Sequence, residues 1–141
     1  MGTASADFSP SRPAIDAAIA AHVGIPYRHG GRGSDGLDCL GLVVSFYRML
    51  GIEVPDGDGA PYPPDWWRHD PGRYLRGIVE HGRSVEDPLQ ALDFVYFAFT
   101  PGIVTHGGIM VDSQRFLHVL EGRSVMVSRL AGFWRDRKST R

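Results

Sequence analysis

The spacing of apolar residues changes along this chain of 141 residues, from helical spacing before residue 51 to strand-like segments after residue 93. Pro13 opens a predicted helix over 14–23, and a second, amphipathic helix is predicted over 39–50. Four β-rich segments with tight connections follow, at 94–99, 106–111, 115–120 and 124–129. Helices first and strands later predict an α+β fold, with N-terminal helices packed on an antiparallel β-sheet.

The length fits a single domain. We expect a flexible N-terminus over 1–12, a folded domain over 13–134 and a basic C-terminal tail over 135–141. The Arg-rich end that starts at Trp134 is interpreted as solvated, with docking to a partner as the alternative. Residues 52–90 are interpreted as an insertion between the second helix and the sheet.

The insertion begins with a stretch rich in Pro, Gly and Asp, and a short helix is predicted over 74–81. Its Tyr62, Trp66 and Trp67 side chains need a surface on which to pack. Because exposed Tyr and Trp often anchor interfaces, these three residues are candidates for binding a partner protein. Packing of the insertion onto its own domain is an equally good interpretation.

Composition argues against several classes of protein. The 15 basic and 16 acidic residues give a net charge of −1, which is unlike a nucleic-acid binder. The apolar runs are far shorter than the ~20 residues that span a bilayer, so membrane insertion is not expected. Residues 1–23 lack the basic and apolar regions of a signal peptide, so we expect synthesis in the cytoplasm without an export signal. The single cysteine excludes an internal disulfide framework.

Cys39 is that single cysteine, and it lies where a thiol becomes reactive. A Gly-rich loop over 24–37 precedes it, Asp38 is a good N-cap, and Cys39 then begins the second predicted helix. The amide groups and the dipole at a helix N-terminus lower the pKa of a thiol and favour its nucleophilic thiolate. The alternative is a small buried hydrophobic residue, as many lone cysteines are.

Two histidines in the strand region can complete a thiol site. His106 is followed by Gly107 and Gly108, which leave space beside it, and His118 lies on the next predicted strand. Adjacent antiparallel strands could bring both imidazoles together on one face. A cysteine, a histidine and a polar orienting group form the set that enzymes use for acyl transfer. Each histidine alone could instead be a hydrogen-bonded strand residue.

The other four histidines fall in loops or at helix ends and are interpreted as surface residues: His22, His29, His69 and His81. The sequence lacks the histidine spacings that are typical of zinc sites, such as H-x₃₋₅-H and H-E-x-x-H. We therefore expect no metal site and no cofactor.

The region around Cys39 resembles the signature of the NlpC/P60 cysteine peptidases. G-I-P-Y at 24–27 with Gly30-Gly31, followed by D-C-L-G-L-V at 38–43, is similar to the loop and first turn of the family's nucleophile helix. The resemblance covers roughly residues 14–130 and keeps the family's order of motifs. Three later segments resemble the strands of the family: L-D-F-V-Y-F at 92–97, T-H-G-G-I-M-V at 105–111 and F-L-H-V at 116–119.

The resemblance implies a papain-like α+β fold and a thiol peptidase. It assigns Cys39 as the nucleophile, His106 as the general base and His118 as the group that orients His106. The implied substrate is the peptide stem of bacterial peptidoglycan, often cut between D-γ-glutamyl and a diamino acid. Further implied roles are stabilisation of the oxyanion, by the Tyr27 hydroxyl and the Cys39 backbone N–H, and substrate contact by Asp38, Gly107 and Gly108.

The chain departs from the usual family pattern at three points. Leu40 and Gly107 replace the commonest serine and valine, and the stretch from Cys39 to His106 is long. P-Y-P-P-D-W at 61–66 is similar to the subgroup found in phage and gene-transfer-agent tail modules. That subgroup implies a virion-associated peptidase with tail-tip or hub proteins as partners, which opens the wall from the outside or the periplasm during DNA delivery. Two alternatives stay open: a tail-tip docking module with a vestigial active site, and a related thiol amidase or acyltransferase.

Overall fold

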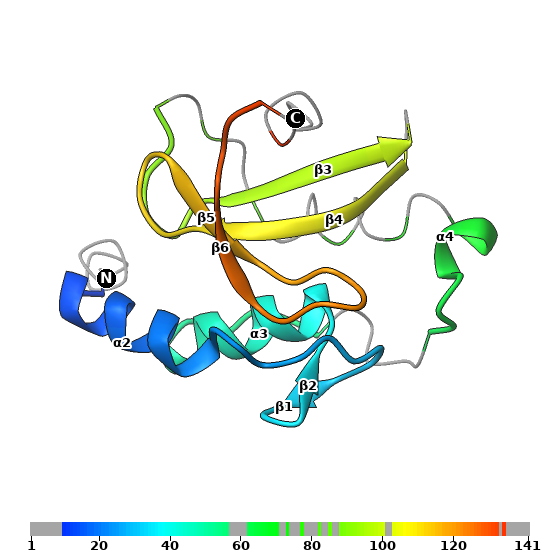
Figure 1. Cartoon of the computed structure of the whole chain (residues 1–141), viewed down its shortest axis with the longest axis horizontal. Helices are drawn as coiled ribbons and strands as arrows, with labels where there is room; N and C mark the ends of the chain where they lie inside the picture. Colours follow the sequence, from blue (N-terminus) through cyan, green and yellow to red (C-terminus); the bar gives the residue numbers. More distant parts are fainter. Residues whose placement is uncertain are drawn as a thin grey trace, which may run out of the picture.

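A computed structural model describes most of the chain, namely residues 10–56, 62–70, 73, 77, 82, 85, 88–100, 103–132 and 134. Two helices, α2 (Arg12–His22) and α3 (Cys39–Met49), lie side by side against a four-stranded antiparallel sheet (Figure 1). The sheet runs in the order β3, β4, β5, β6. The predicted α+β fold, with N-terminal helices on an antiparallel sheet, is confirmed.

The strands of the sheet follow one another in sequence, so each tight connection joins neighbours. Their bounds are β3 (Phe94–Thr100), β4 (Ile103–Met110), β5 (Arg115–His118) and β6 (Met126–Arg129). Strand β4 begins three residues before the predicted start at His106, and β5 ends at His118 instead of the predicted residue 120. The Gly-rich loop also contains a small hairpin that was not predicted, formed by β1 (Arg32–Gly33) and β2 (Gly36–Leu37).

Local signals set the ends of both long helices. The Ser11 hydroxyl accepts a hydrogen bond from the Ala14 amide at the start of α2, and Gly24 after its end has a positive φ of 95°. A positive φ is the left-handed conformation that glycine adopts at little cost. Gly51, just beyond α3, has the same role with a φ of 81°.

The apolar core lies between the helices and one face of the sheet. Its buried members include Ile15 and Ala18 of α2, Leu42 and Phe46 of α3, and Leu117 of β5. A second buried cluster lines the sheet elsewhere, through Val95, Phe97, Met110, Phe116 and Leu130 with Trp134 packed against it. Burial of this apolar surface supplies most of the free energy that offsets the ordering of the chain.

The expected insertion is only partly described. One short helix, α4 (Trp66–His69), follows the Pro-rich stretch. Most of the helix predicted over 74–81 lies outside the described residues, as do the tail expected over 135–141 and residues 1–9 of the N-terminus that was expected to be flexible over 1–12. Among the helices of the described residues, none is long and apolar enough to cross a membrane.

Candidate active site

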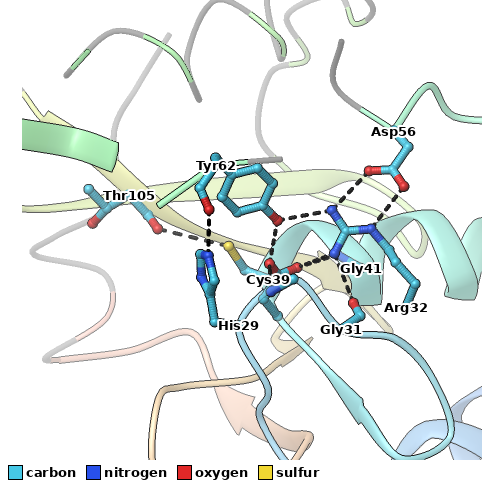
Figure 2. Close-up of polar contacts among 10 residues, drawn as sticks. His29, Gly31, Arg32, Cys39, Gly41, Asp56, Tyr62 and Thr105 are labelled. Carbon is cyan, nitrogen blue, oxygen red and sulfur yellow. Dashed lines mark hydrogen bonds and ion pairs between the residues drawn. The ribbon is translucent and has the colours of Figure 1, made fainter. Parts of the chain in front are cut away.

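Cys39 is the first residue of α3, as predicted, and it faces the sheet. The Asp38 N-cap carboxylate accepts the Gly41 amide at 2.8 Å, which starts the helix at this residue. The half-buried Cys39 sulfur lies 4.0 Å from the carbonyl oxygen of Thr105, the residue before His106 (Figure 2). The fold therefore brings the helix N-terminus and strand β4 together at the thiol, although 66 residues separate them in sequence.

The backbone of the Gly-rich loop packs closely against the first turn of α3. A Cβ atom added to Gly41 would lie 2.1 Å from the carbonyl oxygen of Gly31, closer than any real side chain allows. Only glycine at position 41 lets the Gly-rich loop pack against the first turn of α3. This contact holds the loop that carries Tyr27 and Gly30 against the helix start.

His106 and His118 meet on adjacent strands, as the sequence predicted. Their ring nitrogens, Nε2 of His106 and Nδ1 of His118, are 3.0 Å apart, and the two side chains belong to residues that are only 4% and 0% exposed. The pairing of β4 with β5 sets Gly108 beside His118, where an added Cβ would lie 2.8 Å from the Phe116 ring. Glycine at 108 thus leaves room for the histidine pair.

Burial holds both imidazoles in their neutral form. It lowers the pKa of His106 to about 3, with a smaller contribution from the neighbouring His118, and it lowers the pKa of His118 to about 4. A neutral imidazole has one nitrogen that can accept a proton. His106 Nε2 contacts His118, so Nδ1 is the ring nitrogen of His106 that lies outside this contact.

Ser128 extends the histidine pair, and sequence analysis missed it. Its Oγ lies 2.7 Å from Nε2 of His118, across the β5–β6 ladder. Alternation places residues 126 and 128 on one face of the strand, so the pattern contained a weak signal. The sequence could not give the register that pairs His118 with Met126 and so brings Ser128 within reach.

Trp134 covers the histidine pair, so its interpretation as the start of a solvated tail was wrong. Its ring centroid lies 4.8 Å from that of His118 and 5.4 Å from that of His106. It also packs edge-on against Phe97 at 5.1 Å. Aromatic packing of this kind excludes water from the imidazoles and accounts for part of their burial.

Tyr27 lies near the thiol and stays protonated. Burial raises the pKa of its phenol to about 12, with further contributions from the negative charges of Cys39, Asp38 and Glu121. The Tyr27 amide donates to the Arg123 carbonyl at 2.8 Å, which ties the loop to the segment before β6. A protonated, half-buried hydroxyl beside Cys39 can donate a hydrogen bond to an oxyanion.

Asp38 is the centre of a buried polar network. Its carboxylate accepts hydrogen bonds from the Gly30 amide at 2.9 Å, the Gly41 amide at 2.8 Å and Arg32 Nη1 at 2.9 Å, and also from the Tyr62 hydroxyl (Figure 2). Four donors fill the acceptor sites of a carboxylate. Asp38 is only 3% exposed, so its charge needs these partners.

Arg32 joins this network to the insertion. Its guanidinium binds both carboxylate oxygens of Asp56, at 2.8 and 2.9 Å, and donates to the Tyr62 hydroxyl at 2.9 Å. The carbonyl of Tyr62 lies 2.7 Å from Nε2 of His29. Figure 2 shows these contacts next to Cys39. The part of the insertion that includes Tyr62 is therefore attached to the loops around Cys39.

The other candidate residues are placed as follows. Trp66 is half-buried at the start of α4, and the Trp67 side chain lies outside the described part of the structure. Partner binding by Tyr62, Trp66 and Trp67 stays a prediction. Gly107 is buried on β4 next to His106. Within the described residues, no group of three His, Cys, Asp or Glu side chains is placed to hold a metal ion.

The interpretation of His22 as a surface residue was wrong. His22 is 2% exposed, its Nδ1 lies 2.8 Å from the Ala18 carbonyl oxygen, and its Nε2 lies 2.8 Å from Ser45 Oγ on α3. The end of α2 packs against α3, so a residue near the helix terminus becomes core. His29 is half-buried, His69 is exposed as expected, and His81 lies outside the described residues.

The arrangement supplies the parts of an acyl-transfer site. A thiol stands at a helix N-terminus, a neutral imidazole is held on the adjacent strand by a second imidazole, and a protonated phenol lies nearby. These parts serve as nucleophile, general base, orienting group and oxyanion donor in thiol enzymes.

Comparisons with known proteins agree with this geometry. The family model of the NlpC/P60 family matches residues 24–140. The tail tip assembly protein K of Escherichia phage N15 is 32% identical over 104 residues, which cover 71% of this chain and 42% of that protein. The protein K of Escherichia phage lambda is 27% identical over 117 residues, covering 80% of this chain and 57% of that protein. The chain thus spans about half the length of the curated relatives it matches.

Solved structures share the fold. An NlpC/P60 family protein from Bacillus cereus superposes with a TM-score of 0.69 at 23% identity, over 94% of this chain and 39% of that one. The NlpC/p60 domain of the peptidoglycan hydrolase SagA gives 0.61 at 21% identity, over 88% and 93% of the two chains. RipD from Mycobacterium tuberculosis, described as a non-catalytic NlpC/p60 domain protein adapted to peptidoglycan binding, gives 0.63 at 16%, over 94% and 95%. The match of the family model over most of the chain establishes that this protein belongs to the NlpC/P60 family.

Proposed function

We propose that this chain is a cysteine peptidase that cleaves the peptide stems of bacterial peptidoglycan. The observation that carries the proposal is the 3.0 Å contact between His106 on β4 and His118 on β5, with the Cys39 sulfur 4.0 Å from the carbonyl oxygen of Thr105, the residue before His106. A structural protein has little use for a buried pair of neutral histidines whose strand also meets a thiol at a helix N-terminus, whereas a thiol peptidase needs this combination. Membership of a family that includes a peptidoglycan hydrolase supports the same substrate class.

In the proposed mechanism, His106 Nδ1 takes the proton of the Cys39 thiol while the sulfur attacks the scissile carbonyl carbon. The negative oxygen that forms accepts hydrogen bonds from the Cys39 backbone N–H and the Tyr27 hydroxyl. The carbon–nitrogen bond then breaks, and His106 gives its proton to the leaving amine. Water attacks the thioester with His106 as base, the carbon–sulfur bond breaks, and the thiol regains its proton.

Substrate contact is proposed for Asp38, Gly107 and Gly108. The Asp38 carboxylate already accepts four hydrogen bonds, so a cationic substrate group could bind it only by displacing one of the four donors. The hydroxyl of Tyr62 is the donor that belongs to the insertion. Gly107 and Gly108 are buried neighbours of His106 on β4, and the space beside Gly108 is filled by Phe116 and the Leu117 carbonyl, so any substrate contact that they make is through their backbone groups.

The phage relatives support a location on a tail tip. Two curated relatives are tail tip assembly proteins, and the similarity covers 71% and 80% of this chain. We propose that the domain is carried by a phage-like or gene-transfer-agent tail, contacts tail-tip or hub proteins, and opens the wall from outside during DNA delivery. The aromatic residues of the insertion, Tyr62, Trp66 and Trp67, are the proposed contacts.

The test is digestion of purified sacculi and defined stem peptides, with the released fragments identified by mass spectrometry. Wild type should cut the stem, and Cys39→Ala and His106→Ala should each abolish cleavage. His69→Ala, which removes an exposed histidine, is the matched control and should cleave normally. Undiminished cleavage by Cys39→Ala would rule out the thiol mechanism.

Two other outcomes would favour the alternatives. Binding to sacculi without cleavage by wild type would indicate a docking module, as the fold of the non-catalytic RipD allows. Fragments cut at the bond between sugar and peptide, with the stem intact, would indicate an amidase on the same thiol site.

A further inference from the structure

The hydrogen-bond chain beyond His106 determines which imidazole nitrogens carry protons. His118 contacts His106 through Nδ1 at 3.0 Å and Ser128 through Nε2 at 2.7 Å, so both of its nitrogens have a partner. His118 is fully buried and neutral, which means that it carries one proton on one of these two nitrogens. The two possible tautomers have opposite consequences for the thiol.

In one tautomer, His118 carries its proton on Nε2 and donates it to Ser128 Oγ. Its Nδ1 then accepts from His106 Nε2–H, so that His106 Nδ1 is unprotonated and can take the thiol proton. In the other tautomer, His118 Nδ1–H donates to His106 Nε2. His106 must then carry its own proton on Nδ1, the nitrogen that takes the thiol proton in the proposed mechanism, and cannot act as a base.

We propose that Ser128 is a positioning residue that favours the productive tautomer, by accepting the Nε2–H of His118. The hydroxyl could also donate to an unprotonated Nε2, but its loss harms the productive tautomer more, because a buried N–H is left unpaired less often in proteins than an acceptor is. The Ser128 hydroxyl has the same role after His106 becomes positively charged. When His106 has taken the thiol proton, its Nε2–H can donate only to an unprotonated His118 Nδ1, and this again requires that Ser128 accept from His118 Nε2. Without the hydroxyl, His118 Nε2–H would lose its acceptor in a buried site, and such an unpaired N–H is costly.

The catalytic part of this inference rests on the proposed function, whereas the order of hydrogen bonds does not. The first experiment therefore needs no substrate. The nitrogen signals of the histidines are recorded by NMR on the full chain labelled with ¹⁵N-histidine at pH 7. Wild type should show His118 protonated on Nε2 and His106 protonated on Nε2.

Ser128→Ala should increase the fraction of His118 that is protonated on Nδ1, and Ser128→Thr, which keeps a hydroxyl and suits a strand, should restore the wild-type pattern. The matched control is Ser45→Ala. It removes a hydroxyl from another buried histidine, His22, at the similar distance of 2.8 Å but away from the thiol. This control should leave the signals of His106 and His118 unchanged.

The second experiment measures alkylation of Cys39 by iodoacetamide at pH 6 and hydrolysis of stem peptides. Ser128→Ala should slow both about tenfold, with Ser128→Thr and Ser45→Ala near wild type, because loss of one hydrogen bond shifts an equilibrium by roughly this factor. Cleavage by wild type together with unchanged rates in Ser128→Ala would overturn the inference and leave the proposed function intact. Wild type that cleaves no stem peptide would refute the proposed function, and the NMR signals would still decide the role of Ser128. A wild-type His118 protonated on Nδ1 would overturn the inference directly.

Discussion

Burial of the two neutral histidines should make the folded protein sensitive to mild acid. In the unfolded chain an imidazole titrates near its ordinary pKa of 6.5, whereas burial lowers the pKa of His106 to about 3 and that of His118 to about 4. Between these values the unfolded chain binds protons that the folded chain does not. The contribution of the pair to stability is therefore fully present above about pH 7 and is lost as the pH decreases through 6.5.

The size of the stability loss follows from the distance between the working pH and the pKa of the unfolded imidazole. At pH 5 the unfolded imidazole lies 1.5 pH units below its pKa of 6.5, while both folded imidazoles are still neutral. At about 1.4 kcal/mol per unit, each histidine lowers the free energy of unfolding by about 2 kcal/mol. The pair together could remove up to about 4 kcal/mol, a large share of the ~5–15 kcal/mol that stabilises a typical domain.

The assay is urea unfolding at pH 7, 6 and 5 in a Cys39→Ala background, which excludes effects of the thiol. His118→Asn keeps a carbonyl acceptor for His106 and removes one buried imidazole, so the loss of stability between pH 7 and 5 should shrink by about 2 kcal/mol. His69→Asn removes an exposed histidine and should leave that loss unchanged. If His118→Asn and the background protein lose the same stability, the burial argument is wrong.

Three further outcomes test the site. Gly108→Ala should destabilise the fold by about 1–3 kcal/mol in urea unfolding, because the new Cβ would lie 2.7 Å from a backbone oxygen of β5. The control is Gly33→Ala, whose Cβ would lie 3.4 Å from its nearest atom and which should change stability little. Asp38→Ala removes a helix cap and a buried carboxylate and should lower the free energy of unfolding by about 2–3 kcal/mol. Asp35→Ala, at an exposed ion pair, should lower it by less than about 1 kcal/mol, and equal losses in the two variants would contradict the role of the buried network. Tyr27→Phe should lower kcat about 10²-fold in the stem-peptide assay with unchanged stability, and an unchanged kcat would exclude the phenol as an oxyanion donor.

Local signals in the sequence were enough to predict α2 and α3 and the place of Cys39 at the start of α3. Asp38 caps α3 through a neighbour three residues away, and Gly51 ends the helix through its own backbone conformation. Both interactions depend on adjacent residues, so the pattern contains them. The existence of the four strands was predictable for the same reason, because strand-forming residues and turns alternate locally.

What the sequence could not supply was register and long-range contact. The β1–β2 hairpin was missed because its strands have two residues each and too few side chains to form a pattern. From the sequence, Ser128 is only a polar residue on a predicted strand, because its contact with His118 depends on how β5 pairs with β6. Trp134 likewise became part of the site only through packing on the sheet.

The buried Asp38 makes the Gly-rich loop before Cys39 and the Tyr62 segment of the insertion one cooperative unit. It holds the amides of Gly30 and Gly41, and the same carboxylate is held by Arg32 and Tyr62. Backbone amides in such a unit exchange with deuterium only when the unit opens. The exchange rate of the Gly41 amide should therefore report, from inside the site, how often the Tyr62 segment detaches, and any partner that binds the insertion should change that rate without touching Cys39.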